Sequence, residues 1–81
     1  VVGSAYSFEK EGHTITVGVF SYTYERNGEF LMNHVPNVVI SDSEGCIVAE
    51  PAVHDSIHPN KAIEIARDTG EYAYKYIEEF I

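Results

Sequence analysis

The end of the chain, residues 60–81, repeats apolar side chains with the period of an α-helix. On a wheel of about 3.6 residues per turn, one apolar line consists of Ile63, Ala66, Gly70, Ala73, Ile77 and Phe80, flanked by Ala62, Ile65, Tyr74, Tyr76 and Ile81. The opposite side carries Lys61, Glu64, Arg67, Asp68, Glu71, Lys75, Glu78 and Glu79. Because an isolated helix of this length is marginal in water, the pattern predicts an amphipathic helix that covers a surface built by the preceding residues.

Small residues occupy the middle of this apolar line, namely Ala66, Gly70 and Ala73. A glycine inside a helix costs about 1 kcal/mol relative to alanine. We therefore expect a bulky neighbour or another backbone to come close to Gly70. The helix begins either at Pro59, which is tolerated in a first turn, or at Asn60, which is a good N-cap.

The chain before residue 51 has a period of two residues, which is typical of β-strands. Tyr6 and Phe8 alternate with polar residues up to a turn at Glu11-Gly12, which predicts a first hairpin. Apolar residues then occupy odd positions and afterwards even ones: Ile15, Val17 and Val19, followed by Phe20, Tyr22 and Tyr24. This change of phase indicates either a bulge near residues 18–20 or a strand whose two halves bury opposite faces.

Asn27-Gly28 is the strongest turn signal, because both residues accept the positive φ of a two-residue type I′ loop. It predicts a long strand over residues 13–25 and a partner strand from Glu29. That partner covers residues 30–35 and 38–41, with Pro36 at a strand end, an edge or a bend. A turn at residues 43–45 and a short strand at 46–50 follow. Residues 51–59 form a connection. Whether residues 53–58 form one helical turn within it is left open.

The order of elements predicts an α+β fold of two layers. An antiparallel meander of four to five strands is covered on one face by a single long C-terminal helix. The chain forms one domain, with the meander at 3–50, the connection at 51–59 and the helix at 60–81. If the apolar residues at even positions point to the other face, that face is an exposed apolar surface that another chain would cover. A homodimer or a partner surface is then favoured over a monomer.

Composition narrows the class further. The chain has 81 residues, enough for one small core, and a single cysteine, Cys46, so that an internal disulfide is excluded. A lone thiol fits a reducing compartment, and we expect a cytoplasmic protein. No apolar run is long enough to span a bilayer, and no secretory signal of the usual form is visible. Since the sequence starts at Val1, its natural start is left open.

The formal net charge is -8, from 13 acidic and 5 basic residues. Nucleic-acid backbones are bound by clustered Lys and Arg, which are scarce here, so direct nucleic-acid binding is disfavoured. Residues 27–60 contain no Lys or Arg but several carboxylates, from which we expect one strongly negative end of the fold. The alternative is that the charge only maintains solubility.

Two histidines and the cysteine are the candidates for chemistry. His54 and His58 stand four residues apart, as on one side of a helical turn. A zinc site needs three or four ligands, and only Glu50, Asp55, Cys46 or His34 could complete it, so ordinary surface histidines are the favoured interpretation. Cys46 follows a turn in an acidic stretch, which opposes thiolate formation. We therefore expect no metal, no cofactor and no catalytic residue.

Exposed tyrosines on a strand are better candidates for a contact surface, because aromatic residues are frequent anchors of interfaces. The three helical tyrosines are expected to pack at the edges of the core instead. With the carboxylates of the stretch that lacks basic residues, the predicted partner-binding residues are Tyr22, Tyr24, Glu29, Asp42, Glu44, Glu50 and Asp55.

Two resemblances are present in outline. Residues 42–50, followed by Asn60-Lys61-Ala62 at a helix start, resemble a pattern met in small phage and mobile-element proteins. The strand-rich start with a covering helix is similar to the sheet-and-helix antitoxins of the HicB type, although the glycine-cysteine motif and DNA-binding tail of that family are missing here. Neither resemblance implies an activity.

These observations lead to one main hypothesis on function. We expect a small acidic binding protein without catalysis that docks a negative, tyrosine-bearing surface on a basic protein partner, such as a nucleic-acid-handling enzyme that a phage or mobile element inhibits. The alternatives are an assembly module that forms homo-oligomers through its sheet, or a HicB-like antitoxin-type domain. A metal-dependent enzyme at His54 and His58 is the least favoured hypothesis.

Overall fold

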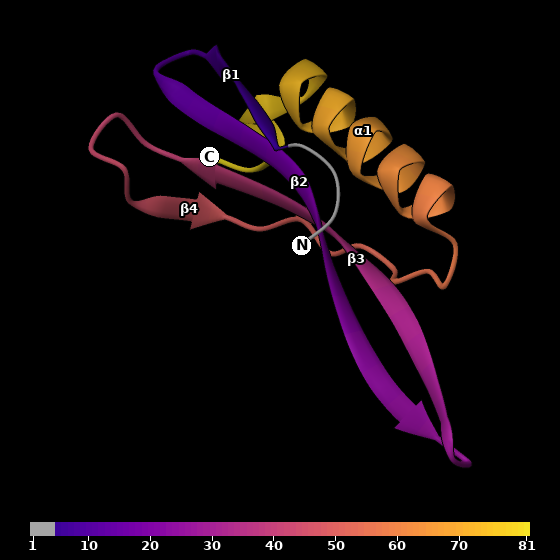
Figure 1. Ribbon diagram of the computed structural model, residues 1–81. Helices are drawn as coiled ribbons and strands as arrows, with labels where there is room; N and C mark the ends of the chain where they lie inside the picture. The colour runs from indigo at the N-terminus through magenta and orange to yellow at the C-terminus, as the bar shows by residue number, and fades with distance from the viewer. Residues whose placement is uncertain (1–4) are drawn as a thin grey trace.

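A computed structural model, which describes residues 5–81, contains a four-stranded antiparallel sheet in the order β1-β2-β3-β4 with one helix packed on it (Figure 1). The strands are β1 (Tyr6–Lys10), β2 (His13–Arg26), β3 (Glu29–Ser41) and β4 (Ile47–Ala49). They are followed by α1 (Pro59–Lys75) and the short 3₁₀ helix η1 (Ile77–Glu79). The predicted α+β meander with two layers is confirmed. Residues 3 and 4 of the predicted meander lie outside the described residues.

Both predicted hairpin turns are present, and each has two central residues. Glu11 and Gly12 have φ of 51° and 78°, and Asn27 and Gly28 have φ of 53° and 78°. Positive φ at both central residues is the requirement of a type I′ turn. The second turn sets an unbroken β2–β3 register that runs from the pair Arg26–Glu29 to the pair Thr14–Ser41.

This unbroken register also decides between the two interpretations of the phase change, since the bulge near residues 18–20 is absent from the β2–β3 pair. Ile15 and Val17 are buried beneath the helix, on what we call the helix face of the sheet. Phe20 and Tyr22 lie on the opposite side, the far face, and each leaves about half of its surface exposed. The apolar side chains of β2 therefore move from the helix face to the far face along the strand, as expected, but those on the far face are not buried.

β3 continues through Pro36, which excludes the strand end, but the edge is present: among residues 5–81 no strand pairs with Pro36 on the side away from β2. The His34 N–H donates to the carbonyl of Ser56 (2.8 Å), and the Ser56 N–H donates to the carbonyl of His34 (2.9 Å). Both backbone groups of His34 thus point away from β2. Because backbone direction alternates along a strand, Pro36 also faces away from β2, and its missing N–H costs no hydrogen bond to β2.

The connection after β4 is extended, so the helical turn considered for residues 53–58 is wrong. Ser56 forms an isolated antiparallel bridge with His34 at the outer edge of β3. The Ser56 hydroxyl accepts a hydrogen bond from the His58 N–H (3.0 Å), which turns the chain into the helix. Pairing with the edge of the sheet gives backbone N–H and C=O groups hydrogen-bond partners that a single helical turn would not provide.

The helix is shorter than the predicted span of 60–81. Pro59 occupies its first position after the N-cap residue His58, and it ends at Lys75. Tyr76 leaves the helical conformation at φ −120° and ψ 43°. The tighter η1 turn then buries Ile77 and lets Phe80 pack against the core. Ile77 and Phe80 therefore pack in the core, as the helical periodicity predicts, although they lie beyond the end of the helix.

The core lies between the helix and the body of the sheet. Its buried residues are Ile15, Val17, Val38, Ile40, Ala66, Ala73 and Ile77. The helix buries only small residues, Ala62, Ala66, Gly70 and Ala73, whereas Ile63 is 44% exposed. The buried line is therefore narrower than the predicted stripe and displaced toward Ala62.

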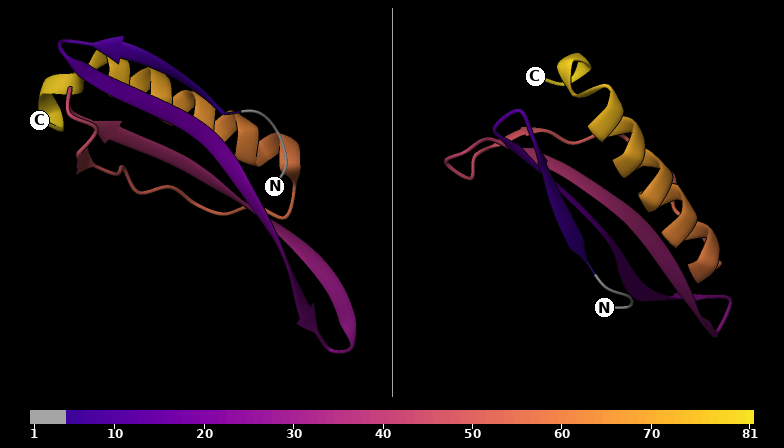
Figure 2. Two further views of the ribbon diagram at one scale, coloured as in Figure 1. Left: turned by 60° about the vertical axis from the view of Figure 1, so that its left-hand side comes forward. Right: turned by 90° about the horizontal axis from the view of Figure 1, so that it is seen from above.

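The helix covers only part of the long hairpin. At about 1.5 Å per residue α1 spans about 26 Å, whereas β2 spans about 46 Å at about 3.3 Å per residue. The distal part of the hairpin, residues 22–33, therefore projects beyond the helix as an arm (Figure 2). This arm gives the molecule its elongated shape of 48 × 21 × 19 Å.

Candidate partner-binding surface

Tyr22 and Tyr24 lie on the far face, because side chains alternate along β2 and the odd residues Ile15 and Val17 face the helix. No helix of residues 5–81 packs on that face of the sheet (Figure 2). The side chain of Tyr22 is 48% exposed and that of Tyr24 is half-buried. Their ring centroids are 6.2 Å apart with a tilt of 49°. This spacing is within the range of favourable aromatic pairs, so the two rings support one another on an open surface.

Asn33 joins this tyrosine pair to the connection before the helix. Its amide nitrogen Nδ2 donates to the hydroxyl of Tyr22 (2.9 Å) and to the carboxylate Oδ2 of Asp55 (3.0 Å). Three predicted contact residues, Tyr22, Tyr24 and Asp55, are therefore brought together. We call these residues and Asn33 the tyrosine–acid surface.

Asn33 was not among the predicted residues, yet a signal for it was present. The Asn27-Gly28 turn sets the register in which Tyr22 pairs with Asn33. The position of Asp55 had no such signal, because it depends on the bridge between Ser56 and His34 across two segments of unrelated pattern.

The other predicted carboxylates are spread over the molecule. Glu29 follows the turn at the tip of the arm, whereas Asp42 and Glu44 belong to the β3–β4 loop at the other end of β3 (Figure 1). Glu50 follows β4 and is exposed. The stretch without basic residues thus runs the length of the sheet, and the expectation that it forms one negative end is wrong.

Asp42 has a role within its own loop. Its carboxylate Oδ1 accepts hydrogen bonds from the N–H groups of Glu44 and Cys46, both at 2.9 Å. The Asp42 N–H in turn donates to the carbonyl of Cys46 (2.8 Å). One oxygen of this predicted contact residue is therefore engaged in closing the loop, and Gly45 supplies the positive φ of 85° that the loop needs.

An acidic hollow does lie at the end of the body, but other residues form most of it. The β1–β2 turn and the β3–β4 loop meet there, and the hollow is lined by Glu9, Lys10, Glu11, Gly12, Thr14, Asp42 and Ser43. The Lys10 ammonium lies 4.5 Å from the centroid of the Tyr74 ring, a cation–π distance. Glu9 and Glu11 lie outside the stretch that lacks basic residues, so they were not among the predicted partner-binding residues.

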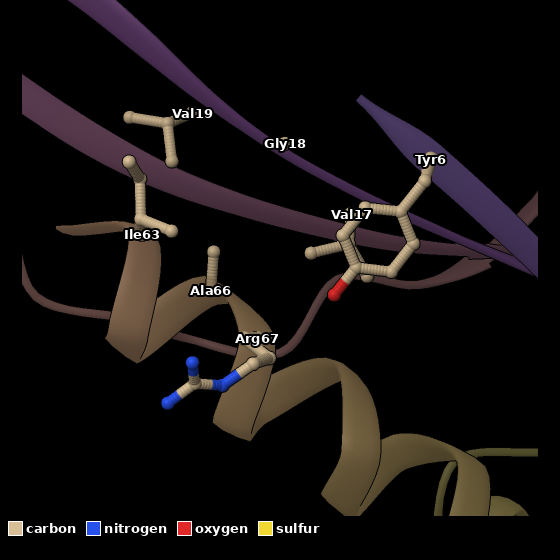
Figure 3. A pocket seen from close by; sticks show the side chains of 7 residues that line it. All are labelled: Tyr6, Val17, Gly18, Val19, Ile63, Ala66 and Arg67. Carbon is tan, nitrogen blue, oxygen red and sulfur yellow. The ribbon is translucent and has the colours of Figure 1, made fainter. Parts of the chain in front are cut away.

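A small apolar notch separates the helix from β1 and β2 (Figure 3). It is lined by Tyr6, Val17, Gly18, Val19, Ile63, Ala66 and Arg67 and has a volume of about 180 Å³. Pockets for drug-sized ligands hold about 300–1,000 Å³. The notch is therefore below the size of an ordinary small-molecule site.

The main candidates for metal binding and nucleophilic chemistry lie at the surface, whereas His34, named as a possible further ligand, is only 4% exposed. His54 and His58 are exposed, as is the free thiol of Cys46. Within residues 5–81, no group of three or more His, Cys, Asp or Glu side chains is arranged to hold a metal ion.

The helical tyrosines pack at both edges of the core, as expected. Tyr74 meets the ring of Phe8 at 5.3 Å in an edge arrangement, while Tyr72 lies 4.8 Å from Tyr76. The Tyr72 hydroxyl donates to the carboxylate of Glu79 at 3.2 Å. The negative charge of Glu79, followed by partial desolvation, raises the pKa of Tyr72 above its ordinary value of 10.0.

No protein-family model, curated protein or solved structure matches this chain. In the part of the chain that the structure describes, no helix has the length and apolar character needed to cross a membrane.

Proposed function

We propose that this chain is a small non-enzymatic binding protein that docks the tyrosine–acid surface on a basic protein partner. The observation that supports this function best is the link from Tyr22 through Asn33 to Asp55 on a face of the sheet that the helix leaves open. Two aromatic rings and a carboxylate are thereby presented together. Aromatic anchors beside a charged group are typical of interface centres.

The geometry reduces the entropic cost of binding. The Tyr22 hydroxyl and the Asp55 carboxylate are both held by the Asn33 amide, at 2.9 and 3.0 Å. The Tyr22 ring is further supported by Tyr24. Side chains that are already ordered lose less freedom on association than mobile ones.

The net charge of -8 favours a partner with a basic surface. Complementary charge accelerates encounter and suppresses binding to acidic proteins. Enzymes that handle nucleic acids have grooves lined with Lys and Arg for phosphate groups, and carboxylates on a rigid sheet can occupy such a groove. We therefore propose an inhibitor of such an enzyme, of the kind that phages and mobile elements use.

The test begins with co-purification of the chain from its native host and identification of a basic nucleic-acid-handling enzyme bound to it. Association kinetics with that enzyme are then measured from about 50 to about 500 mM salt, and we expect the association rate to fall by about tenfold or more. Tyr22→Ala and Asp55→Asn should each weaken binding, while Glu64→Gln on the outer side of the helix should not. Salt-independent association, or unchanged binding by both surface variants, would refute the proposal.

A further inference from the structure

Beyond β1, the edge of β2 has outward-pointing backbone groups with which no residue of the described range 5–81 pairs. Since both backbone groups of His34 point away from β2, the residue opposite it, Ser21, has its own groups directed away from β3. Alternation extends this direction to Val19, Thr23 and Glu25. These residues therefore present N–H and C=O groups on the side of β2 where β1 lies.

This open edge has defined limits. Among the described residues, the pairing of β1 with β2 ends at the pair Tyr6–Val17. At the other limit the chain turns at Asn27. Among residues 5–81, nothing pairs with the β2 edge over residues 19–25. An unpaired strand edge of this length is a template for another strand.

The same segment carries exposed aromatic rings and little charge. Phe20 and Tyr22 are 54% and 48% exposed on the far face, and Tyr24 follows on the same face. Glu25 is the one charged residue within 19–25, although the chain as a whole has a net charge of -8. Apolar rings beside an open backbone edge favour burial against an extended, uncharged segment.

We propose that a second copy of this chain occupies the edge, with the two β2 strands antiparallel about a two-fold axis at Tyr22. In this register Val19 lies opposite Glu25 of the second copy, and Ser21 lies opposite Thr23 of the second copy. All four outward-facing residues of each strand then exchange backbone hydrogen bonds. The two four-stranded sheets become one continuous sheet.

The axis at Tyr22 is the one that uses the whole edge. It is the midpoint of residues 19–25, so any shifted register leaves outward groups unpaired or drives the turn of one copy into β1 of the other. The two Glu25 side chains lie six residues apart along the seam, about 20 Å at 3.3 Å per residue. Their mutual repulsion is therefore weak at physiological salt.

The same register aligns the aromatic rings. The even residues of β2 occupy non-hydrogen-bonded pairs, in which side chains on neighbouring strands lie closest. Phe20 thus meets Tyr24 of the second copy, and Tyr22 meets its own symmetry mate. A row of six rings forms on the far face.

A second copy fits this edge better than a basic partner does, because a basic strand would find only Glu25 as a counter-charge. The area is small, however. Aromatic side chains bury about 150–250 Å² when fully covered, so two half-exposed rings and the less exposed Tyr24 of each copy, with the backbone edge, give roughly 1,000 Å² in total at most. This lies at the lower limit of specific interfaces, and we expect a dissociation constant on the order of micromolar.

The first test is the mass of the chain alone from about 5 to about 500 μM, by sedimentation equilibrium. The wild-type mass should double over this range. Thr23→Pro removes an outward N–H but no hydrogen bond to β3, just as Pro36 in β3 lacks an N–H without losing a bond to β2. This variant should stay monomeric with an unchanged circular dichroism spectrum. Thr23→Ala, the matched control, should dimerise like the wild type. A wild-type monomer at all concentrations, or a folded Thr23→Pro dimer, would overturn the inference.

The second test locates the axis by cross-linking. In a Cys46→Ser background, Tyr22→Cys should form a disulfide-linked dimer on mild oxidation, because only a residue at the axis meets its own copy. Leu31→Cys, on the same face but in β3, should cross-link at least tenfold more slowly. Equal rates would overturn the register. Both tests use the chain without any basic partner, so their outcome is independent of the proposed docking function.

Discussion

Gly70 of the helix lies directly against Val17 of the central strand. A Cβ atom added to Gly70 would lie 2.6 Å from Val17 Cγ2. Such a separation is far shorter than the contact distance of about 3.5–4.0 Å between carbon atoms. The absence of a side chain at residue 70 therefore sets how closely the helix approaches the sheet.

Gly70→Ala is expected to lower the free energy of unfolding by about 1–2 kcal/mol. Overpacking costs about 1–3 kcal/mol, and the better helix propensity of alanine returns about 1 kcal/mol. Denaturant unfolding followed by circular dichroism measures the change. In a Val17→Ala background the same substitution should be neutral or stabilising, and an equal loss in both backgrounds would contradict a steric cause. Glu71→Ala serves as an exposed helical control.

Ser21→Ala should destabilise the fold by about 1–3 kcal/mol. The Ser21 hydroxyl lies 2.6 Å from Nδ1 of His34, whose side chain is only 4% exposed. Loss of the hydroxyl leaves a buried ring nitrogen without its partner, which costs about that amount. Thermal unfolding of Ser21→Ala is to be compared with that of Ser21→Thr, which retains a hydroxyl, and of Thr23→Ala, which is exposed. Equal midpoints for all three variants would show that the hydrogen bond contributes nothing.

Asp42→Ala should destabilise the β3–β4 loop by about 1 kcal/mol or more, because one carboxylate oxygen accepts two backbone N–H bonds. Asp42→Asn should retain most of the stability, since its amide oxygen can accept the same bonds. Hydrogen exchange of the Glu44 and Cys46 amides measures the loop directly. Glu44→Ala provides the control, and comparable protection in Asp42→Ala and Glu44→Ala would refute the capping role.

Tyr72 should ionise at higher pH than an isolated tyrosine, since the charge of Glu79 raises its pKa above 10.0. The unfolded chain then loses this proton first as the pH rises. Stability is therefore fully present below pH 10 and declines as the pH rises through 10 toward the folded-state pKa. Near-ultraviolet titration of wild type and Glu79→Gln should show an earlier ionisation in the variant. Glu78→Gln is the control, and identical curves for wild type and Glu79→Gln would exclude this interaction.

Local rules were sufficient to predict much of the fold. Asn27-Gly28 specifies a type I′ turn because Asn and Gly both tolerate positive φ, and Gly12 marks the turn of the first hairpin. The glycine in the middle of the helical stripe indicated close packing, and Val17 is the neighbour. These signals depend on one or two residues, so no tertiary information was needed.

Features that depend on distant contacts were not predictable. The helix ends at Lys75 although the apolar period continues, because burial of Ile77 is achieved by the η1 turn instead. The pairing of Ser56 with His34 has no periodic signature, and it places Asp55 beside Asn33. The tyrosine–acid surface was therefore predicted as a set of residues but not as an arrangement.

The two long edges of the sheet differ in a way that limits growth. On the outer side of β3, Pro36 has no N–H to offer, Ser56 already occupies His34, and β4 covers Ile40. β1 offers an outer edge of only five residues, which includes Glu9 and Lys10. Within the described part of the chain, the longest unpaired stretch of strand edge is that of β2. A dimer formed there leaves only short edges, at β1 and at residues 29–33 of β3, for the addition of further copies, so growth into fibrils is disfavoured.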